Sequence, residues 1–458
     1  MCDCKSHLAV SGKEQFLYGR SPRPIALKNG MVIGGGQVYP ELNFTLPPML
    51  VEDSTYAAVK EHYRQMTTGA LHRALELHAA GVVVEVELLP PMTINADWGI
   101  EITKIVRDIM FDFEANKGLK SALRLTPNDT REFVRPPIMR SGMYLENMLK
   151  VFEGAAKAGA DFLSIESTGG KEVHDDALVN ADLLQAIFAL GVLGARDMDF
   201  LWRKIVGIAE ANGSIAAGDS ACGFANTAMV LAEKGMIPGV FASVIRVATV
   251  GRAMVAFDVG AKGPSKDCAY EGPFVKAIAG VPIAMEGKAA ACAHLSPVGN
   301  VAACVADMWS NESVQNVKLL ADMAPTVSME QLIYDCRLMN TASQDGDGAH
   351  RLIKWLADSD SHLSPQAHVL RPDVVLKLSE KIAATSDPYL RTVIGTRAAI
   401  EEIKTAYEAG EVQLPPREAK WIGLIEAQLD EVPDTAEELT EMMLPMLEGK
   451  FLPKEYGL

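Results

Sequence analysis

The chain has 458 residues, of which 48% are hydrophobic and 22% charged, and this composition excludes a disordered or collagen-like protein. Its 59 acidic and 43 basic side chains give a net charge of −16, which argues against nucleic acid or a membrane surface as a partner. The seven cysteines form a sparse, odd-numbered set, typical of a reducing compartment where thiols bind metals or fill the core.

Residues 1–54 predict an irregular N-terminal arm. This stretch is rich in glycine and proline, with three glycines at Gly34–Gly36, and glycine and proline interrupt regular structure. It also lacks the apolar run of a signal peptide. We therefore expect an arm that precedes the folded part of the chain.

From residue 55 to about residue 350, strand-like and helical stretches alternate. The predicted strands are apolar or β-branched runs at residues 82–86, 121–125, 161–165, 214–217, 254–258 and 281–285. The predicted helices lie beside them, at residues 57–79, 102–117, 144–158, 183–193, 225–234 and 274–279. Strands separated by helices imply right-handed crossovers and a parallel sheet. The number of repeats favours an α/β fold of the (β/α)8 TIM barrel type over an open doubly wound sheet.

The most apolar long stretch of the chain covers residues 237–261. It carries Arg246, Arg252 and Asp258, which is too much charge for a membrane-spanning helix. We therefore expect a soluble, cytoplasmic protein with no membrane partner.

The last part of the chain, residues 351–458, predicts a helical C-terminal extension. Strand signals fade there, and prolines separate helical stretches such as 418–429 and 436–443. Thr435, with Glu438 three residues later, fits a capping box at the start of the second stretch.

Three loops that follow predicted strands carry candidate chemistry, at residues 164–172, 218–223 and 263–273. A barrel places its active site at this end of the strands, so Glu166, Cys222 and Cys268 could converge on one ion. Two thiolates and a carboxylate suit Zn²⁺ and leave its fourth tetrahedral position open, as in catalytic zinc sites. The alternative is that both cysteines are small core residues in tight turns, and spacing alone leaves both interpretations open.

Other candidates are weaker. Cys292, His294 and Cys304 could bind a second metal, but no fourth ligand stands nearby and core packing is the favoured interpretation. Ser220 lies in a motif that lacks the last glycine of a nucleophile elbow, which argues against a serine hydrolase. The sequence has no Walker loop and no complete dinucleotide fingerprint, so ATP or nicotinamide chemistry is not expected.

Several sequence blocks in the same order carry a resemblance to a known family. They include STGGKEV at 167–173, ANTAM at 225–229, GPSKDC at 263–268, MEGK at 285–288, CAH at 292–294, WSNESV at 309–314 and LMNTA at 338–342. Together they resemble the methanol:corrinoid methyltransferases, over roughly residues 40–458. Residues before about 30 do not share the resemblance.

The resemblance implies a (β/α)8 barrel whose zinc is held by one glutamate and two cysteines, which by motif are Glu166, Cys222 and Cys268. It implies transfer of the methyl group of methanol to the Co(I) corrinoid of a partner protein, with zinc activating the methanol hydroxyl. It further implies a heterotetramer of two catalytic and two corrinoid subunits, in the oxygen-free one-carbon metabolism of methanogenesis or acetogenesis.

Residues next to the three expected ligands are candidates for supporting roles, although the sequence does not rank them. They are Asp219, Lys266, Asp267 and Tyr270.

The corrinoid is expected on a separate carrier protein. The string closest to a cobalamin-binding signature is Asp360-Ser361-His362, and it has Pro365 in place of the required glycine, so we interpret it as a turn. One alternative function is a corrinoid-dependent demethylase of another donor, such as a methoxylated aromatic. Others are a zinc methyltransferase that activates a thiol, whose related family uses histidine and cysteine ligands, and a non-catalytic scaffold for the corrinoid protein.

Overall fold

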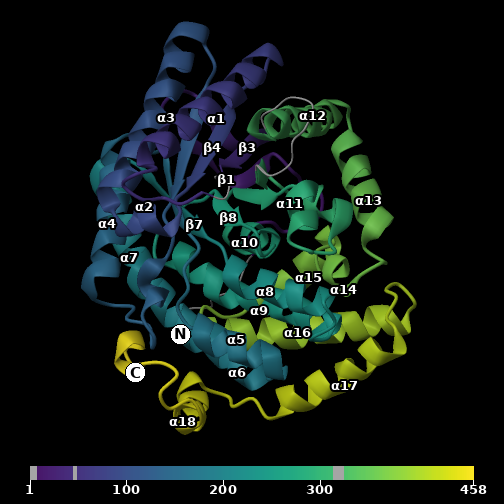
Figure 1. The fold of residues 1–458 in the computed structure, drawn as a ribbon. Coiled ribbons are helices and arrows are strands. Elements are labelled where there is room, and N and C mark those ends of the chain that lie inside the picture. Colours follow the sequence, from purple (N-terminus) through teal and green to yellow (C-terminus); the bar gives the residue numbers. More distant parts are fainter. Residues whose placement is uncertain (1–7, 45–48, 313–323) are drawn as a thin grey trace, which may run out of the picture.

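The computed structural model describes residues 8–44, 49–312 and 324–458, which form a barrel of parallel strands surrounded by helices (Figure 1). Its sheet of eight strands follows the chain order around the barrel, and every neighbouring pair in the ladder is parallel. The strands are β3 (Tyr39–Phe44), β4 (Val82–Glu87), β5 (Ser121–Thr126), β6 (Phe162–Ile165), β7 (Ile215–Asp219), β8 (Ser265–Asp267), β9 (Ile283–Glu286) and β10 (Met308–Glu312).

Hydrogen bonds between the two end strands of this ladder close the barrel. The N–H of Lys262 donates to the carbonyl of Ala216, and that of Gly263 to the carbonyl of Ala217, both at 2.8 Å. These bonds join the start of β8 to β7, so the predicted (β/α)8 barrel is confirmed.

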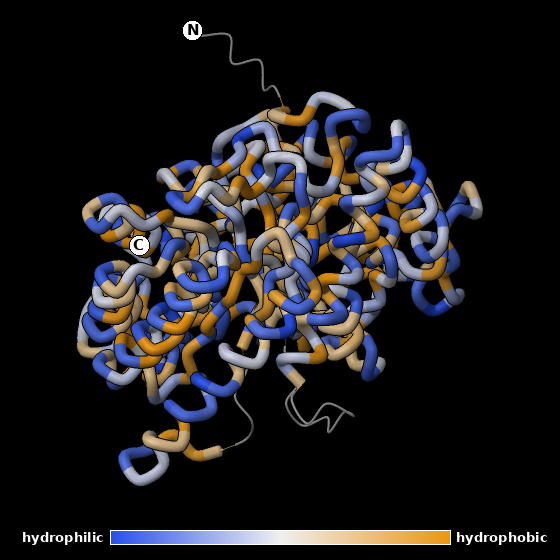
Figure 2. Tube along the Cα trace, turned by 90° about the horizontal axis from the view of Figure 1, so that it is seen from above, coloured by the Kyte–Doolittle hydropathy of each residue, from blue (hydrophilic) through white to orange (hydrophobic). Residues whose placement is uncertain are grey.

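Helices follow the strands and cover the outside of the barrel (Figure 1). They are α1 (Tyr56–Glu76), α2 (Pro90–Ile94), α3 (Ala96–Lys117), α4 (Gly142–Lys157), α5 (Lys171–Asn180), α6 (Leu183–Ile187), α7 (Ala195–Asn212), α8 (Cys222–Glu233), α9 (Gly239–Asp258), α10 (Gly272–Ala279), α11 (Lys288–Ala293) and α12 (Ala324–Gln344). Along the outer helices, hydrophobic and hydrophilic residues alternate, as amphipathic helices on a core require (Figure 2).

The N-terminal region differs from the expected irregular arm. An antiparallel hairpin, β1 (Arg20–Ala26) and β2 (Val32–Gly35), precedes β3, which is already the first barrel strand. Its sequence, YPELNF, contains proline, glutamate and asparagine, which are depleted in strands, and this hid it from prediction. The barrel therefore begins at Tyr39, while the domain boundaries at residues 54 and 350 stay a prediction.

The expected strand at residues 254–258 is wrong, because these residues are the last turns of helix α9. A continuous apolar run does not distinguish a buried strand from a buried helix. By length and composition α9 is the one described helix apolar enough to cross a membrane, but 94% of its most apolar window is buried inside the protein. It is a core helix.

The C-terminal region is helical, in agreement with the predicted helical extension. Its helices are α13 (Gly348–Asp360), α14 (Pro365–His368), α15 (Pro372–Ile382), α16 (Pro388–Glu408), α17 (Pro416–Asp430) and α18 (Ala436–Met446). Helix α16 lies along α9 (Figure 1). One of the two hydrogen bonds of the predicted capping box is present, since Thr435 Oγ1 accepts from the N–H of Glu438 at 3.2 Å.

Alternation along the strands sorts the inside of the barrel into layers. In β4, Val82, Val84 and Val86 pack outward in the large core shared with the helices, whereas Val83 belongs to a separate apolar cluster inside the barrel. That cluster closes the amino end of the strands, together with the hairpin. Its buried members are Ile25, Leu27, Met31, Ile33, Tyr39, Val83, Ala122, Phe162, Ala217, Ala284 and Met308.

Candidate active site

The three expected metal ligands meet at the carboxyl end of the strands. Glu166 directly follows β6, Cys222 is the first residue of α8, and Cys268 directly follows β8. One carboxylate oxygen and the two sulfurs all lie within 4.8 Å of one another. The structure therefore brings together three residues that are 56 and 46 positions apart in the chain.

This donor set fits zinc. Two ligands bound at 2.0–2.3 Å to a tetrahedral zinc lie about 3.5 Å apart, and Cys268 Sγ lies 3.4 Å from Glu166 Oε1. Asn226 Nδ2 donates to Cys222 Sγ at 3.1 Å, a contact that stabilises a thiolate more than a thiol. That these residues bind zinc stays a prediction.

Without metal, burial and mutual contact disfavour the charged forms of the ligands. Burial raises the pKa of Glu166 to about 7, although the charge of Lys266 opposes this rise. The hydrogen bond with Cys222, together with burial, raises the pKa of the Cys268 thiol well above its usual range. A metal that binds here must therefore displace protons from its ligands.

Lys266 lies inside a group of carboxylates that come from β4 and from the loop after β6. Its Nζ is 3.0 Å from Glu85 Oε1, 2.7 Å from Glu87 Oε2 and 3.1 Å from Glu166 Oε1. Burial would lower the pKa of Lys266, but these carboxylates raise it well above its usual value. A permanent cation is thus fixed beside the carboxylate of the expected metal site.

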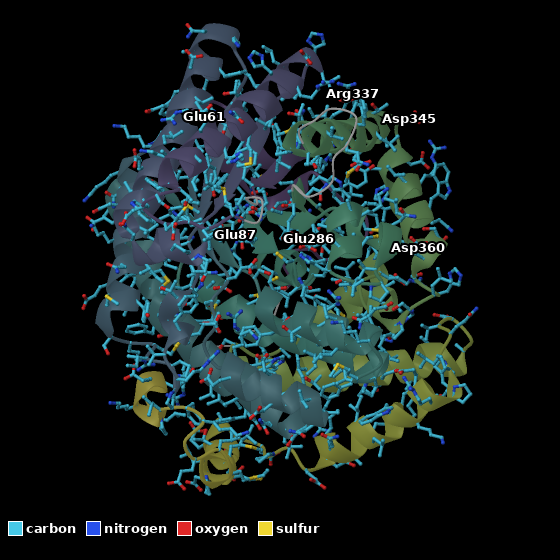
Figure 3. The ribbon with its side chains drawn as sticks, viewed as in Figure 1. Glu61, Glu87, Glu286, Arg337, Asp345 and Asp360 are labelled. Atoms are coloured by element: carbon cyan, nitrogen blue, oxygen red, sulfur yellow. The ribbon has the colours of Figure 1, made fainter. Side chains whose placement is uncertain are left out.

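A small cavity opens beside Cys268 and Lys266. It is lined by Asn43, Glu85, Lys266, Cys268, Glu286, Ser310, Asn311 and Glu312. Its volume is ≈240 Å³, part of which is open to solvent. Two residues at this end of the barrel, Glu87 at the end of β4 and Glu286 at the end of β9, lie near the centre of the view in Figure 3.

Comparison with known proteins identifies the family of this chain. The chain matches the model of the methanol-cobalamin methyltransferase B subunit family over residues 3–457. The chain belongs to this family. It is 34% identical over 461 residues to the methanol–corrinoid protein co-methyltransferase of Methanosarcina barkeri, with 98% of each chain covered. Its fold matches the crystal structure of the methanol:cobalamin methyltransferase complex MtaBC from Methanosarcina barkeri, with a TM-score of 0.94, 32% identity and 99% of each chain covered.

Membership makes the chain a methyltransferase and confirms the family resemblance read from the sequence blocks. The match spans the barrel and the helical extension, and it begins at residue 3, so the expectation that residues before about 30 lie outside the resemblance is wrong. The metal and its ligands in this methyltransferase are argued from the geometry of the site and not from the family match.

Asp219, one of the supporting residues expected in the methyltransferase, holds the loop after β6 by hydrogen bonds. Its Oδ1 accepts from Arg252 Nη2 at 3.1 Å and from the N–H of Ser167 at 3.4 Å, and its Oδ2 accepts from Trp202 Nε1 at 3.0 Å. It therefore ties the loop that carries Glu166 to the end of β7. The side chain of Asp267 lies outside the described part of the structure.

Tyr270, which follows β8, contacts the end of the neighbouring strand β9, because its Oη lies 3.4 Å from Glu286 Oε2. Its backbone has φ 65°, a left-handed conformation that is uncommon outside glycine and occurs at functional sites. Ser220, rejected as a nucleophile, instead accepts through Oγ from the N–H of Cys268 at 3.1 Å, which couples the two cysteine loops.

Sequence reasoning missed one group of the methyltransferase site. Within the described residues, His294 gathers with Glu286 and Glu312 and not with Cys292 or Cys304. Cys292 is exposed and Cys304 is buried, so the second metal considered for the two cysteines is not assembled. The available signal was that both glutamates stand at the last position of a strand.

The C-terminal segment also reaches the site. Tyr456 is buried, and its Oη donates to Glu172 Oε1 at 2.9 Å and accepts from the N–H of Gly170 at 3.0 Å. Both partners lie in the loop and helix that follow Glu166. The last residues of the extension therefore fix the loop that carries one expected ligand.

Proposed function

We propose that this methyltransferase transfers the methyl group of methanol to the Co(I) corrinoid of a partner protein, with a zinc ion held by Glu166, Cys222 and Cys268. The observation that carries the proposal is the convergence of one carboxylate and two thiols within 4.8 Å beside a small cavity. Family membership supports the same reaction.

Zinc in this position supplies Lewis acidity, which lowers the pKa of a bound hydroxyl and stabilises charge that develops on its oxygen. The chain contributes the rest. Asn226 holds the Cys222 sulfur, and Lys266 holds the Glu166 carboxylate and offsets part of the negative charge of the three ligands. The small cavity positions the alcohol and limits water around it.

The lining of the cavity and the donor set bear on the alternative functions. The cavity is lined by polar and charged side chains and by Cys268, and none of these described residues is an aromatic on which a methoxylated ring would stack. A glutamate among the expected ligands also argues against the thiol-activating zinc methyltransferases, which use histidine and cysteine. The presence of all three donors in one place argues against a non-catalytic scaffold.

The corrinoid is supplied by a separate protein that docks over the carboxyl end of the barrel. The string Asp360-Ser361-His362 ends helix α13 and enters a turn, as expected for residues that do not form a corrinoid site. The similar crystal structure is that of a methanol:cobalamin methyltransferase complex, which supports a two-component assembly. We further propose a heterotetramer of two catalytic and two corrinoid subunits, in the cytoplasm of an organism with oxygen-free one-carbon metabolism.

Anaerobic absorption spectroscopy tests the reaction. The zinc-loaded protein is mixed with its corrinoid protein in the Co(I) state, and methanol is added. We expect the Co(I) band to disappear and a methylated Co(III) spectrum to replace it. If methanol has no effect and a methoxylated aromatic drives the change, the substrate is wrong. If no methyl donor works although zinc is present at one ion per chain, the proposed reaction is wrong.

A further inference from the structure

A histidine held between two carboxylates stands beside the cavity, and the proposed zinc site does not use it. His294 follows α11, and its Nδ1 lies 2.8 Å from Glu286 Oε1, an ion-pair contact rather than an aligned hydrogen bond. Its Nε2 lies 3.3 Å from Glu312 Oε2. An ionised carboxylate accepts and does not donate, so an imidazole that faces one through each nitrogen takes the doubly protonated, charged form. Burial raises the pKa of Glu286, and the contact with His294 opposes that rise.

The electrostatics of the cluster agree with this assignment. The contact with Glu286 and then that with Glu312 raise the pKa of His294 to about 11. Charged and titratable groups from the neighbouring elements face the same region: Glu85 and Glu87 from β4, Lys266 and Cys268 from and after β8, and Cys222 from α8. His294 therefore carries a proton at neutral pH.

The cluster is placed to act on a molecule in the cavity. Glu286 and Glu312 line the cavity together with Cys268, so the cluster and one expected zinc ligand border the same space. Glu286 is 3% exposed, whereas 24% of the His294 side chain is exposed. The cluster thus connects the cavity to a proton source that solvent can replenish.

The reaction needs such a proton. When the C–O bond of methanol breaks, the oxygen departs as hydroxide, a poor leaving group unless it is protonated. Two thiolates and a carboxylate carry three negative charges, which exceed the two positive charges of Zn²⁺ and weaken its action as a Lewis acid. A general acid beside the oxygen supplies what the metal site lacks.

We propose that His294 supplies a proton to Glu312 and that Glu312 passes it to the departing oxygen of methanol. This inference rests on the function proposed above. The electron pair of Co(I) forms the bond to the methyl carbon, so cobalt is oxidised to Co(III) and the methyl carbon is reduced. The C–O bond breaks with its electron pair on oxygen, and the proton from His294 Nε2 converts that oxygen to water. Neutral His294 then regains a proton from solvent.

Kinetics of two variants test the relay in the zinc-loaded enzyme with its Co(I) corrinoid protein and methanol. Glu312→Gln and His294→Gln remove the relay and the source, and we expect each to slow the loss of the Co(I) band by about 10²–10⁴-fold, the usual contribution of a general acid. Zinc content, measured by atomic spectroscopy, should stay at one ion per chain in both. His362→Gln is the matched control, because His362 is an exposed histidine in the turn after α13, and it should react at the wild-type rate.

A second readout does not depend on turnover. ¹⁵N NMR of the histidine side chains is recorded on zinc-free protein. The wild-type signals that are missing from the spectrum of His294→Gln belong to His294. Between pH 6 and 9 these signals should have the chemical shifts of an imidazolium. In Glu312→Gln the pKa of His294 should fall, because one of its two carboxylate partners is lost.

The outcomes separate this inference from the function on which it rests. If wild-type enzyme does not methylate the corrinoid from methanol, both proposals are wrong. If wild-type enzyme reacts and both variants react equally fast with zinc bound, only the proton relay is wrong. Loss of zinc from either variant, or a neutral His294 at pH 7, also overturns the relay.

Discussion

The two ends of the barrel are built from the same strands and have opposite character. At the amino end, inward residues such as Val83 and Phe162 are apolar and are sealed by the β1–β2 hairpin. At the carboxyl end, only a few positions later in the same strands, the inward residues include Glu87 and Glu166. Every second residue of a strand points inward, so the same strand places apolar side chains at the amino end and carboxylates at the carboxyl end. Barrels of this type separate a stable amino end from a carboxyl end that carries the chemistry.

A buried ion pair separates the two ends. Arg124 Nε contacts Glu41 Oε1 at 2.6 Å, and its Nη1 donates to Ser164 Oγ at 2.7 Å and to the carbonyl of Pro264 at 2.9 Å. Arg124 and Glu41 are fully buried. Because both charges of this pair have a partner, the layer isolates the apolar cluster from the carboxylates above it.

The largest expected effect breaks the carboxyl end alone. Cys268→Ala removes one of the three expected ligands, so zinc content should fall close to zero and methyl transfer should fall by about 10³-fold or more. Atomic spectroscopy and the Co(I) assay measure these losses, and circular dichroism should show an intact fold. Cys292→Ala is the control, since this exposed cysteine lies outside the trio. Full zinc occupancy in Cys268→Ala would rule out the ligand assignment.

A second change breaks the amino end alone. Ile33 in the hairpin is fully buried in the apolar cluster, and Ile33→Ala should lower the free energy of unfolding by about 2–5 kcal/mol through lost burial and a cavity. Ile33→Val, the conservative control, should cost about 0.5–1.5 kcal/mol. Denaturant unfolding measures both, and folded Ile33→Ala should still bind one zinc per chain. Loss of zinc from the folded variant would show that the two ends are not separate.

A third test sharpens the comparison through pH, and the size of its effect depends on the pH interval. His174 on α5 is fully buried against Phe224 of the helix that begins with Cys222, and burial lowers its pKa to about 3. The unfolded chain binds this proton near pH 6.5 and the folded chain does not. Lowering the pH from 6.5 toward 3 should therefore destabilise the fold, by up to about 1.4 kcal/mol per pH unit.

His174→Gln provides the comparison for this pH effect. Between pH 6.5 and 4 the unfolding free energy of His174→Gln should fall less steeply than that of the wild type. The difference in slope should correspond to the binding of one proton on unfolding. The cost of Ile33→Ala should not change over the same range, because the cluster around Ile33 has no group that titrates there. Equal slopes for wild type and His174→Gln would show that His174 is not held neutral.

Barrel strands that consist of β-branched runs could be predicted from the sequence. VVVEVE at residues 82–87 is recognisable as β4, whereas β3 and β10 carry glutamate, asparagine and serine because they face a polar interior. β8 has only three residues, too few for a pattern. The expected ligand trio was predictable because each member follows a strand of a βα unit, and parallel strands bring all such positions to one end.

The cluster around His294 was not predictable in the same way. It depends on register, since Glu286 pairs with Ser310, and Glu312 lies two residues further along β10 on the same side. It also depends on where the short helix α11 ends. Neither the strand register nor the end of a six-residue helix follows from local sequence. The sequence therefore shows both glutamates but does not predict that they lie next to each other.

The contact of Tyr456 with Glu172 has a consequence for how the protein is made. The two residues are 284 positions apart, and ribosomes add about 5–20 residues per second, so Glu172 is synthesised roughly 15–60 s before its partner. During that interval the barrel strands can form, but the loop beside Glu166 lacks the hydroxyl that fixes it. In a growing chain, the loop beside Glu166 therefore gains this hydrogen-bond partner only after Tyr456 has been added, when all eight barrel strands have already been synthesised.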